Sequence, residues 1–343
     1  MNMKALVKTK EGPGNVCLME VPEPKAGPGQ VKIRVAAVGI CGTDIKIHHG
    51  DTWSNPPVIL GHEFSGVVEE VGEGVTHVKP GDRVVSETAQ VICGNCYYCN
   101  TGNQLMCPQR LSIGYGTNGA MAKYCVVRQQ IVHKLPDSVS LDDAALCEPS
   151  AVAVHAVYDT VKLYPTDLAV VMGPGPIGLL VAQAVKGFGC TVMLTGTDKD
   201  ADRLELGKKL GMDYILDTTK EDLEAKIQEL TGGMGADVVY DCSGAAPAIR
   251  AGMSALKKMG TLVQVGLTKQ NLEIEYGLLT QRQLSIMGTF GHNWKAWEIV
   301  TRLIKDGKLN VSDLISHHFK LEDWEEAFDI AAKQQGVKLL IHP

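Results

Sequence analysis

The segment from Leu168 to Val185 constrains the fold of this chain most strongly. It reads as an apolar strand, LAVVM, a turn that contains Gly173, Gly175 and Gly178, and a helix, IGLLVAQAV. Because the glycines and prolines interrupt the apolar run, the segment is not expected to cross a membrane. A GxGxxG between a strand and a helix allows a tight turn and aims a helix N-terminus at an anion. The segment therefore predicts a dinucleotide-binding turn; the alternative is that the glycines serve only helix–strand packing.

The chain after this turn alternates between strands and helices. Apolar runs of strand length follow at TVMLT, YIL, DVVYD and TLVQVG, and helical segments such as DADRLELGKKLG and KEDLEAKIQELT separate them. Right-handed crossovers place such helices on both faces of a parallel sheet. Residues 151–290 are therefore predicted to form an α/β domain with a doubly wound, Rossmann-type parallel sheet.

An acidic residue follows the second strand of this predicted domain. Asp198 lies 20 residues beyond Gly178, where a carboxylate can hydrogen-bond the adenosine ribose of a nucleotide. The 2′-phosphate of NADP would meet like charge there, so NAD is the predicted cofactor. Two alternatives stay open: Asp198 caps the next helix instead, or the nearby Thr197, Lys199 and Arg203 accommodate a phosphate.

The first 150 residues follow a different pattern. Short β segments such as VKIRVAAVGI, FSGVVEEVG and GDRVVS alternate with frequent Gly and Pro, which predicts an antiparallel, barrel-like domain. Near the C-terminus, WKAWEIVTRLIKDGKL is predicted to be an amphipathic helix and VKLLIHP a short strand. We expect residues 291–343 to rejoin the domain that residues 1–150 form.

Composition and charge exclude several classes of partner. The balance of 33 basic and 39 acidic residues gives a net charge of −6, which argues against nucleic acid and against a polybasic membrane surface. The first residues lack the apolar core and cleavage site of a secretory signal, so a cytoplasmic protein is expected. In that compartment the ten cysteines predict metal ligands or buried thiols rather than disulfides. Small molecules are the predicted partners.

Four of the cysteines lie in one polar loop. Cys93, Cys96, Cys99 and Cys107 are spaced C-x2-C-x2-C-x7-C, and four thiolates within fifteen residues can surround one tetrahedral ion. The alternatives are disulfides and an iron–sulfur run, but the last gap of that run is about three residues rather than seven. The loop therefore predicts a structural zinc site. Five scattered cysteines are interpreted as packing residues: Cys17, Cys125, Cys147, Cys190 and Cys242.

A second set of metal-ligand types is dispersed along the sequence. Cys41 lies in GICGTD, His62 and Glu63 lie in LGHEFSG, and Glu148 lies in LCEPSAV. A thiolate, an imidazole and a carboxylate that leave one coordination position open make a catalytic zinc site. Each residue alone also fits an ordinary core cysteine or a hydrogen-bonded polar side chain. Their occurrence together with the cysteine loop and the nucleotide turn favours the catalytic site.

These motifs, in this order, resemble the zinc-containing medium-chain dehydrogenases, the superfamily of liver-type alcohol dehydrogenase. GICGTD, GHEFSG, the GDRV turn, the cysteine loop, EPSAVAVHAV and GPGPIG carry the resemblance, which spans essentially the whole chain. The resemblance implies a GroES-like catalytic domain, a Rossmann domain, two Zn²⁺ per chain and a homo-oligomer, either a dimer or a homotetramer. Glu63 after His62, and Glu148 before Pro149, resemble the branch of sorbitol dehydrogenase and L-threonine 3-dehydrogenase. In that branch Cys and His hold the zinc with one or both glutamates, directly or through water, which implies these roles for Cys41, His62, Glu63 and Glu148.

The resemblance also implies roles for other residues. Thr43 is expected to accept the hydroxyl proton of the substrate and to pass it towards solvent; the alternative is a threonine bonded to the backbone in a turn. Arg203 resembles a residue that packs on the adenosine, and the segments VGL and GTF resemble those that line the nicotinamide. The expected cofactor-binding residues are Gly173, Gly175, Pro176, Ile177, Gly178, Asp198, Arg203, Val265, Leu267 and Thr289.

The substrate is less constrained than the chemistry. Threonine dehydrogenases usually carry a histidine where this chain has Lys46 and another where it has Ala89, although GTFGHNWKAWEIVTRLIKDGKLN resembles them. The prediction is therefore an NAD-linked oxidation of a secondary hydroxyl on a small polyol or sugar alcohol, with L-threonine or a phosphorylated polyol as alternatives. An inactive scaffold with a binding or regulatory role is a further alternative. Five side chains are candidates for a polar substrate cleft, unless they simply face solvent: Lys46, His48, His49, Trp53 and Glu87.

Overall fold

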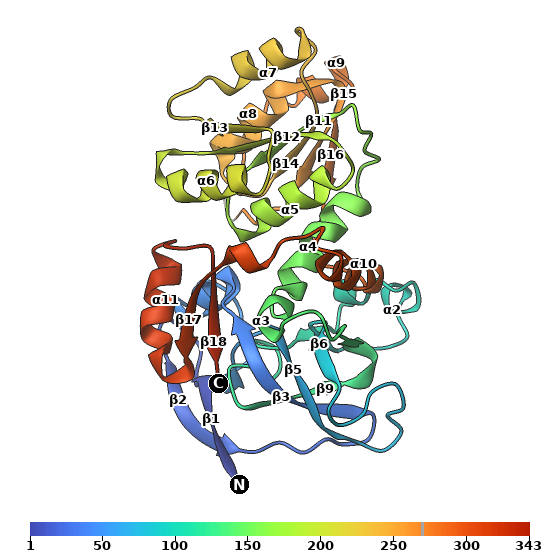
Figure 1. The fold of residues 1–343 in the computed structure, drawn as a ribbon, viewed down its shortest axis with the longest axis vertical. Helices are drawn as coiled ribbons and strands as arrows, with labels where there is room; N and C mark the ends of the chain where they lie inside the picture. The colour runs from blue at the N-terminus through green and yellow to red at the C-terminus, as the bar shows by residue number, and fades with distance from the viewer. Residues whose placement is uncertain (269–270) are drawn as a thin grey trace. The chain divides into compact units, whose positions relative to one another are not determined.

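A computed structural model describes residues 1–268 and 271–343 of the chain. It separates into two compact units (Figure 1). The first unit comprises residues 1–148, 293–306 and 311–343, and the second comprises residues 149–292 and 307–310. No helix in the described ranges combines the length and apolar character that a membrane crossing requires.

The first unit is built mainly of antiparallel strands. These are β1 (Asn2–Lys8), β2 (Val16–Pro22), β3 (Gln30–Gly39), β4 (Val58–Ile59), β5 (Glu63–Val71), β6 (Arg83–Ser86), β7 (Ala89–Val91), β8 (Leu111–Ser112), β9 (Tyr124–Arg128), β10 (Val132–Lys134), β17 (Ile315–Lys320) and β18 (Lys338–His342). The largest sheet has the order β10-β6-β5-β3-β18-β17, and β9 also pairs with β3. Smaller sheets join β2, β1 and β4, and β7 with β8. The antiparallel β-domain predicted for this region is confirmed.

Alternating side chains of β3 build the core of the first unit. Val31, Ile33 and Val35 are buried in one cluster with Leu339 and Ile341 of β18. Because β18 pairs with β3, the last residues of the chain complete this core. The helices of the unit are α1 (Gly42–His48), α2 (Tyr97–Asn100), α3 (Leu141–Ala144), α10 (Trp294–Lys305) and α11 (Trp324–Ala332), and α4 (Cys147–Tyr158) begins in it.

Two elements of the C-terminal region were not predicted from the sequence. The strand β17 has the sequence ISHHFK, in which polar residues hide the alternation, and its side chains are only half-buried on their inner face. Helix α11 buries Trp324, Ala327 and Phe328 against the core. Both elements depend on contacts with β18 and the core rather than on a strong local pattern.

The second unit is an α/β domain with a parallel sheet. Its strands are β11 (Leu168–Met172), β12 (Thr191–Gly196), β13 (Tyr214–Asp217), β14 (Ala236–Asp241), β15 (Leu256–Gln264) and β16 (Ser285–Gly288), and its helices are α5 (Pro176–Lys186), α6 (Ala201–Lys209), α7 (Leu223–Thr231), α8 (Ala246–Ala255) and α9 (Gly277–Gln281). The strand order is β13-β12-β11-β14-β15-β16, and every pair is parallel. Figure 1 shows α5 and α6 on one side of this sheet and α7 and α8 on the other. The predicted Rossmann fold is confirmed.

The burial of the scattered cysteines departs from the sequence interpretation at one position. Cys125, Cys147 and Cys190 are buried, as expected of packing residues, and Cys242 is half-buried. Cys17 is exposed, because it faces outward on β2. The interpretation of Cys17 as a packing residue is therefore wrong.

Candidate metal centres and cofactor site

Asp44 connects Cys41 and His62 in the first unit. Cys41 immediately precedes α1, and His62 immediately precedes β5. Asp44, fully buried in the first turn of α1, accepts a hydrogen bond from Cys41 N at 2.9 Å on Oδ2, while its Oδ1 lies 3.8 Å from His62 Nδ1. A carboxylate behind a histidine fixes the orientation of that ring in metal sites. Asp44 therefore positions both predicted ligands. Asp44 is not among the predicted site residues, although a carboxylate in GICGTD at the start of a helix was the available signal.

A buried lysine from the end of the chain holds Glu63. Lys338, the first residue of β18, forms an ion pair with Glu63 and donates a hydrogen bond to Ile40 O at 3.0 Å. Gly39 makes room for the pair, because a Cβ at this position would overlap the Glu63 carboxylate. Lys338 was also missed, since no local motif marks it and only the pairing of β18 with β3 brings it to the site.

The cluster around Cys41 fits a zinc ion. One donor atom each from Cys41, His62 and Glu63 lies within 4.8 Å of the others. Within the described ranges, the buried polar atoms that lack a hydrogen-bond partner include Asp44 Oδ1, His62 Nδ1 and Glu63 Oε2, although Glu63 has its ion pair. Asp44 Oδ1 and His62 Nδ1 face each other at 3.8 Å, and Glu63 Oε2 faces Lys338, so these atoms belong to the contacts that position the donors. A thiolate, an imidazole and a carboxylate are donors that zinc prefers.

Glu148 lies outside this three-donor group but interacts with it electrostatically. Burial raises the pKa of Glu148 to about 7; the positive charge of His62 opposes this shift, and Glu63 adds to it. Burial alone would lower the pKa of His62, but the charges of Cys41, Asp44 and Glu148 raise it well above its ordinary value. The anionic groups therefore stabilise a positive charge at this place, which is the electrostatic requirement of a cation site.

The four-cysteine loop has the dimensions of a tetrahedral thiolate site. The sulfur atoms of Cys96 and Cys99 are 3.5 Å apart, those of Cys93 and Cys107 are 3.6 Å apart, and those of Cys93 and Cys99 are 3.9 Å apart. Thiolates that share one zinc lie about 3.8 Å apart, because Zn–S bonds are about 2.3 Å long. A disulfide needs about 2.05 Å. All four are free thiols, and their arrangement fits the predicted structural zinc.

The glycine turn lies where the order of the parallel sheet reverses. β11 has β12 on one side and β14 on the other, and nucleotides bind outside the carboxyl ends of strands at such a point. Gly173 follows β11 with a φ of +95°, and a Cβ on Gly178 would overlap the carbonyl oxygen of Gly173. Gly175 precedes Pro176 and Ile177, the first residues of α5, and its Cα faces open space. Gly173 and Gly178 thus each have a structural reason to lack a side chain, and at Gly175 the turn is open towards a ligand.

The residues after β12 show whether Asp198 caps the next helix or is left available to bind a ribose. Asp200 provides the cap at this helix start, since its Oδ2 accepts hydrogen bonds from Thr197 N at 3.0 Å and Thr197 Oγ1 at 2.9 Å. Arg203 lies 3.9 Å from the other oxygen of Asp200. The Asp198 side chain is exposed. The capping alternative therefore belongs to Asp200, and Asp198 stays the predicted partner of the ribose.

The segments expected to line the nicotinamide follow the adjacent strands β15 and β16. Val265 N donates a hydrogen bond to Asp241 O at 2.9 Å, and Thr289 N donates one to Gln264 O at 3.2 Å. Leu267 is 64% exposed. These bonds place Val265 and Thr289 at the carboxyl edge of the sheet, the same edge as the glycine turn, and Leu267 follows two residues after Val265.

Two candidates for the substrate cleft have other partners. Glu87 is buried, and its Oε1 lies 3.0 Å from His133 Nε2. His48 packs edge-on against Trp324 and Phe328, with ring centroids 5.9 Å and 5.8 Å apart. These contacts account for Glu87 and His48 without a substrate. Of the other three candidates, His49 and Trp53 are exposed and Lys46 is half-buried.

Comparison with known proteins assigns this chain to a protein family. The model of the alcohol dehydrogenase GroES-like domain matches residues 27–137, and the model of the zinc-binding dehydrogenases matches residues 176–306. The chain is 42% identical over 342 residues to a sorbitol dehydrogenase of Halalkalibacterium halodurans, with 99% of each chain covered. The chain belongs to the zinc-containing medium-chain dehydrogenases. The family, the enzyme class and the cofactor class of zinc with NAD(H) predicted from the sequence are confirmed.

Other members of the dehydrogenase family are similar to this chain in sequence or in structure. It is 42% identical to D-arabitol-phosphate dehydrogenase of Enterococcus avium, with 99% of this chain and 97% of that protein covered. It is 38% identical to L-threonine 3-dehydrogenase of Pyrococcus horikoshii, with 96% and 95% covered. Among solved structures, a zinc-binding dehydrogenase of Sinorhizobium meliloti bound to NADP has a TM-score of 0.93 at 30% identity and full coverage of both chains. The 2R,3R-butanediol dehydrogenase of Bacillus subtilis has a TM-score of 0.90 at 34% identity, with 99% of each chain covered.

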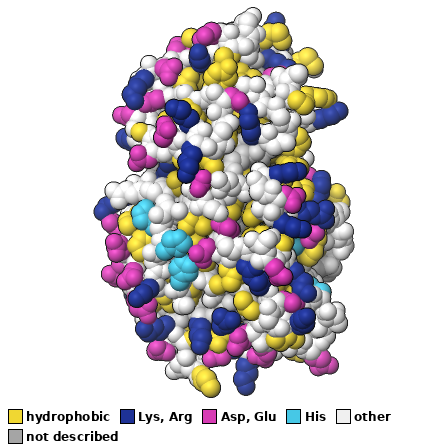
Figure 2. Space-filling model, viewed as in Figure 1, with side chains coloured by type: hydrophobic (Ala, Val, Ile, Leu, Met, Phe, Trp, Pro, Cys, Tyr) yellow, Lys and Arg dark blue, Asp and Glu magenta, His cyan; other side chains and the backbone are white. Residues whose placement is uncertain are grey.

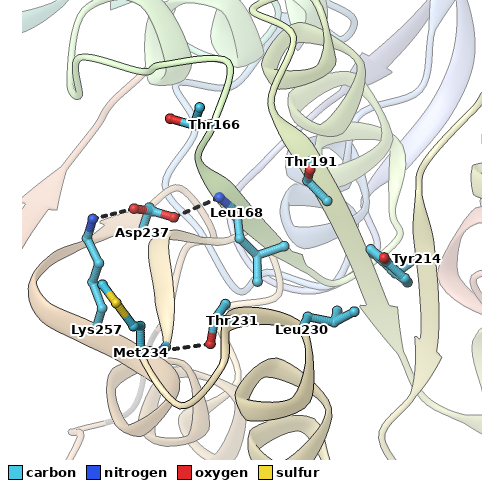
Figure 3. Close-up of a pocket in the computed structure, with 10 residues that line it drawn as sticks. Thr166, Leu168, Thr191, Tyr214, Leu230, Thr231, Met234, Asp237 and Lys257 are labelled. Atoms are coloured by element: carbon cyan, nitrogen blue, oxygen red, sulfur yellow. Dashed lines mark hydrogen bonds and ion pairs between the residues drawn. The ribbon is translucent and has the colours of Figure 1, made fainter.

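A pocket in the second unit of this dehydrogenase lies at the edge opposite the glycine turn. It has a volume of about 350 Å³. Leu168, Thr191 and Tyr214, which begin β11, β12 and β13, line it together with Asp237 and Lys257 (Figure 3). Asp237 accepts a hydrogen bond from Leu168 N at 2.7 Å and forms an ion pair with Lys257, so its carboxylate is already satisfied. The pocket is therefore not the cofactor site, which needs the carboxyl ends of the strands.

Replacing Lys338 with methionine is expected to lower the free energy of unfolding of this dehydrogenase by about 3 kcal/mol, because it leaves the buried charge of Glu63 without its partner. Chemical denaturation measures this change. Lys333→Met is the matched control, since the Lys333–Asp329 pair is exposed and such pairs contribute about 1 kcal/mol or less. Adding Glu63→Gln to Lys338→Met should restore most of the loss. Equal effects of the two lysine variants would contradict the role of the buried pair.

Proposed function

We propose that this chain oxidises a secondary hydroxyl of a small polyol or sugar alcohol to a ketone, with NAD as the hydride acceptor. The observation that carries the proposal is the group of half-buried Cys41 with buried His62 and Glu63, whose donor atoms lie within 4.8 Å of one another. Its donor set and its surrounding negative charge both suit zinc. The open turn at Gly173–Gly178 supports a dinucleotide in the second unit.

The reaction divides between the metal, the cofactor and residues of the chain. Zinc bound at this site supplies a Lewis acid that lowers the pKa of a substrate hydroxyl. Cys41, His62 and Glu63 would hold the ion, and Glu148 would contribute directly or through water. Asp44 fixes the orientation of Cys41 and His62 through the contacts described above. Thr43, half-buried in α1, takes the hydroxyl proton and passes it to solvent. Bound NAD would accept the hydride from the carbon that carries this hydroxyl, so the products would balance as ketone, NADH and one proton.

The sequence identities to known relatives support a polyol as the substrate. The sorbitol and D-arabitol-phosphate dehydrogenases are each 42% identical to this chain, whereas the threonine dehydrogenase of Pyrococcus horikoshii is 38% identical. A phosphorylated polyol is the second candidate, because Lys46 lies on α1, the helix that follows Cys41, and carries a charge that suits a phosphate. NAD rather than NADP is proposed because Asp198 is exposed and is not the helix cap.

A panel assay of NADH formation tests the proposed function. Sorbitol, xylitol, galactitol, their phosphates and L-threonine are compared at equal concentration, and initial rates with NAD and NADP are measured on the best substrate. The expected result is turnover of a polyol or its phosphate with a preference for NAD. Turnover of L-threonine alone would overturn the substrate class, and a strong preference for NADP would overturn the role of Asp198.

Two further features support proposals about the oligomeric state and the cellular compartment of the enzyme. The edge strand β16 exposes Ile286 by 42% and Met287 by 40%, and unpaired apolar edges are sites of strand pairing between subunits. We place a homo-oligomer contact there, and light scattering of the purified protein measures the assembly. All ten cysteines are free thiols, which supports a reducing compartment such as the cytoplasm.

A further inference from the structure

A third group of metal-ligand side chains lies on the surface of the first unit. Figure 2 shows histidine side chains gathered on the face that carries β17 and β18. His318 comes from β17, His342 from β18 and Asp142 from α3. The cluster shares β18 with Lys338, but His342 lies at the opposite end of this strand. It is therefore separate from the catalytic site.

The three side chains converge on one point. His318 Nδ1 lies 3.0 Å from His342 Nε2, and the two rings stack with centroids 5.3 Å apart. The two oxygens of Asp142 each lie 3.9 Å from a ring nitrogen, Oδ2 from His318 Nδ1 and Oδ1 from His342 Nδ1. One donor atom from each residue lies within 4.8 Å of the other two. Donors that share a tetrahedral zinc lie about 3.3 Å apart, because Zn–N and Zn–O bonds are about 2.0–2.2 Å long.

A contact with the backbone fixes the orientation and the tautomer of the His342 ring. Its Nδ1 lies 3.0 Å from the carbonyl oxygen of Ala36 on β3, and only a protonated Nδ1 can donate to this oxygen. In the neutral ring, Nε2 is then free of a proton and points at His318. Metal-binding histidines commonly use their second nitrogen in this way, because the contact fixes both tautomer and ring orientation. A hydrogen bond between the two imidazoles uses the same nitrogen atoms, so the test must distinguish a shared proton from a shared metal.

We propose that Asp142, His318 and His342 bind a divalent transition-metal ion, with Zn²⁺ as the best match to two imidazoles and one carboxylate. The donor set has the composition of a three-ligand zinc site, and it leaves the remaining coordination positions to water because the side chains are 35–52% exposed. The site ties α3 to β17 and β18. Lys320 pairs with His342 in the strand register, so a positive charge stands beside the site and weakens it relative to the two enclosed sites.

Equilibrium dialysis against free Zn²⁺ tests this proposal on the intact enzyme with its family zinc sites loaded. Metal analysis should find one more Zn²⁺ per chain in the wild type than in His318→Ala or His342→Ala, with binding at this site weakened at least about tenfold in Asp142→Asn. His317→Ala is the matched control: it removes a neighbouring imidazole of β17, whose Nδ1 instead contacts Ser316 Oγ at 2.9 Å, and should keep the extra ion.

Spectroscopy provides a second measurement that needs no variant. Cu²⁺ added to the zinc-loaded wild type should give an electron paramagnetic resonance spectrum with hyperfine splitting from two imidazole nitrogens. Equal Zn²⁺ content of the wild type, His318→Ala and His342→Ala would overturn the proposal, as would a Cu²⁺ spectrum without nitrogen splitting. Since none of these readouts depends on turnover, failure of the proposed function would leave them unchanged.

Discussion

Cys41→Ala should reduce kcat/KM for the best substrate at least about a thousandfold while the protein stays folded. Lewis-acid stabilisation by a catalytic metal contributes several kcal/mol, and about 4 kcal/mol corresponds to three powers of ten in rate. The thiol lies at the N-terminus of α1 and is only half-buried, so its removal should disturb packing little. Steady-state kinetics measure the loss, and far-UV circular dichroism checks the fold.

Metal analysis and a matched cysteine variant control this experiment. Cys41→Ala should contain one fewer tightly bound zinc per chain than the wild type. Cys17→Ala removes a free thiol that is exposed on β2 and belongs to none of the metal-ligand groups in the described ranges, and it should keep full activity and metal content. Full activity of Cys41→Ala would defeat the assignment of the catalytic site. A wild type with only the zinc of the cysteine loop would instead favour the inactive scaffold.

Cys96→Ala should lower the free energy of unfolding by at least about 5 kcal/mol and remove the other tightly bound zinc. Structural zinc contributes about 10–16 kcal/mol of apparent binding free energy in small zinc-binding peptides, and much of it should be lost with one of four ligands. The loop holds its sulfur atoms 3.5–3.9 Å apart and has few buried side chains of its own, so the ion is its main constraint. Thermal and chemical denaturation with zinc analysis measure the effect.

A neighbour in the same helix controls for loss of a side chain. Tyr97 begins α2 and is 74% exposed, so Tyr97→Ala should leave stability within about 0.5 kcal/mol and metal content unchanged. If Cys96→Ala unfolds at the same denaturant concentration as Tyr97→Ala, the loop does not depend on a metal ion for its stability.

Much of the fold could be predicted because its signals are local. The strand, turn and helix at 168–186 lie in one segment, and the hydrophobic alternation of β3 and the cysteine spacing are each visible within about fifteen residues. The six-stranded parallel sheet follows from repeated short patterns and the handedness of crossovers. The predicted fold class and family were therefore accessible without a structure.

The groups that position the candidate site were harder to predict, because they depend on long-range pairing. Lys338 reaches Glu63 only through the pairing of β18 with β3. The contacts of Asp44 with Cys41 and His62 form only because α1 places its carboxylate between them. The cluster of Asp142, His318 and His342 joins three elements that no sequence motif relates. Conversely, Glu87 and His48 looked available in the sequence but have protein partners in the fold.

The central claim is that one zinc ion is held by the thiolate of Cys41 and the imidazole of His62. Anomalous diffraction at the zinc absorption edge, from crystals of the enzyme with NAD, tests this most directly. The account predicts a peak bonded to Cys41 Sγ and a nitrogen of His62, and a second peak inside the four-cysteine loop. Density that shows Cys41 and His62 side by side with no anomalous peak between them would contradict it.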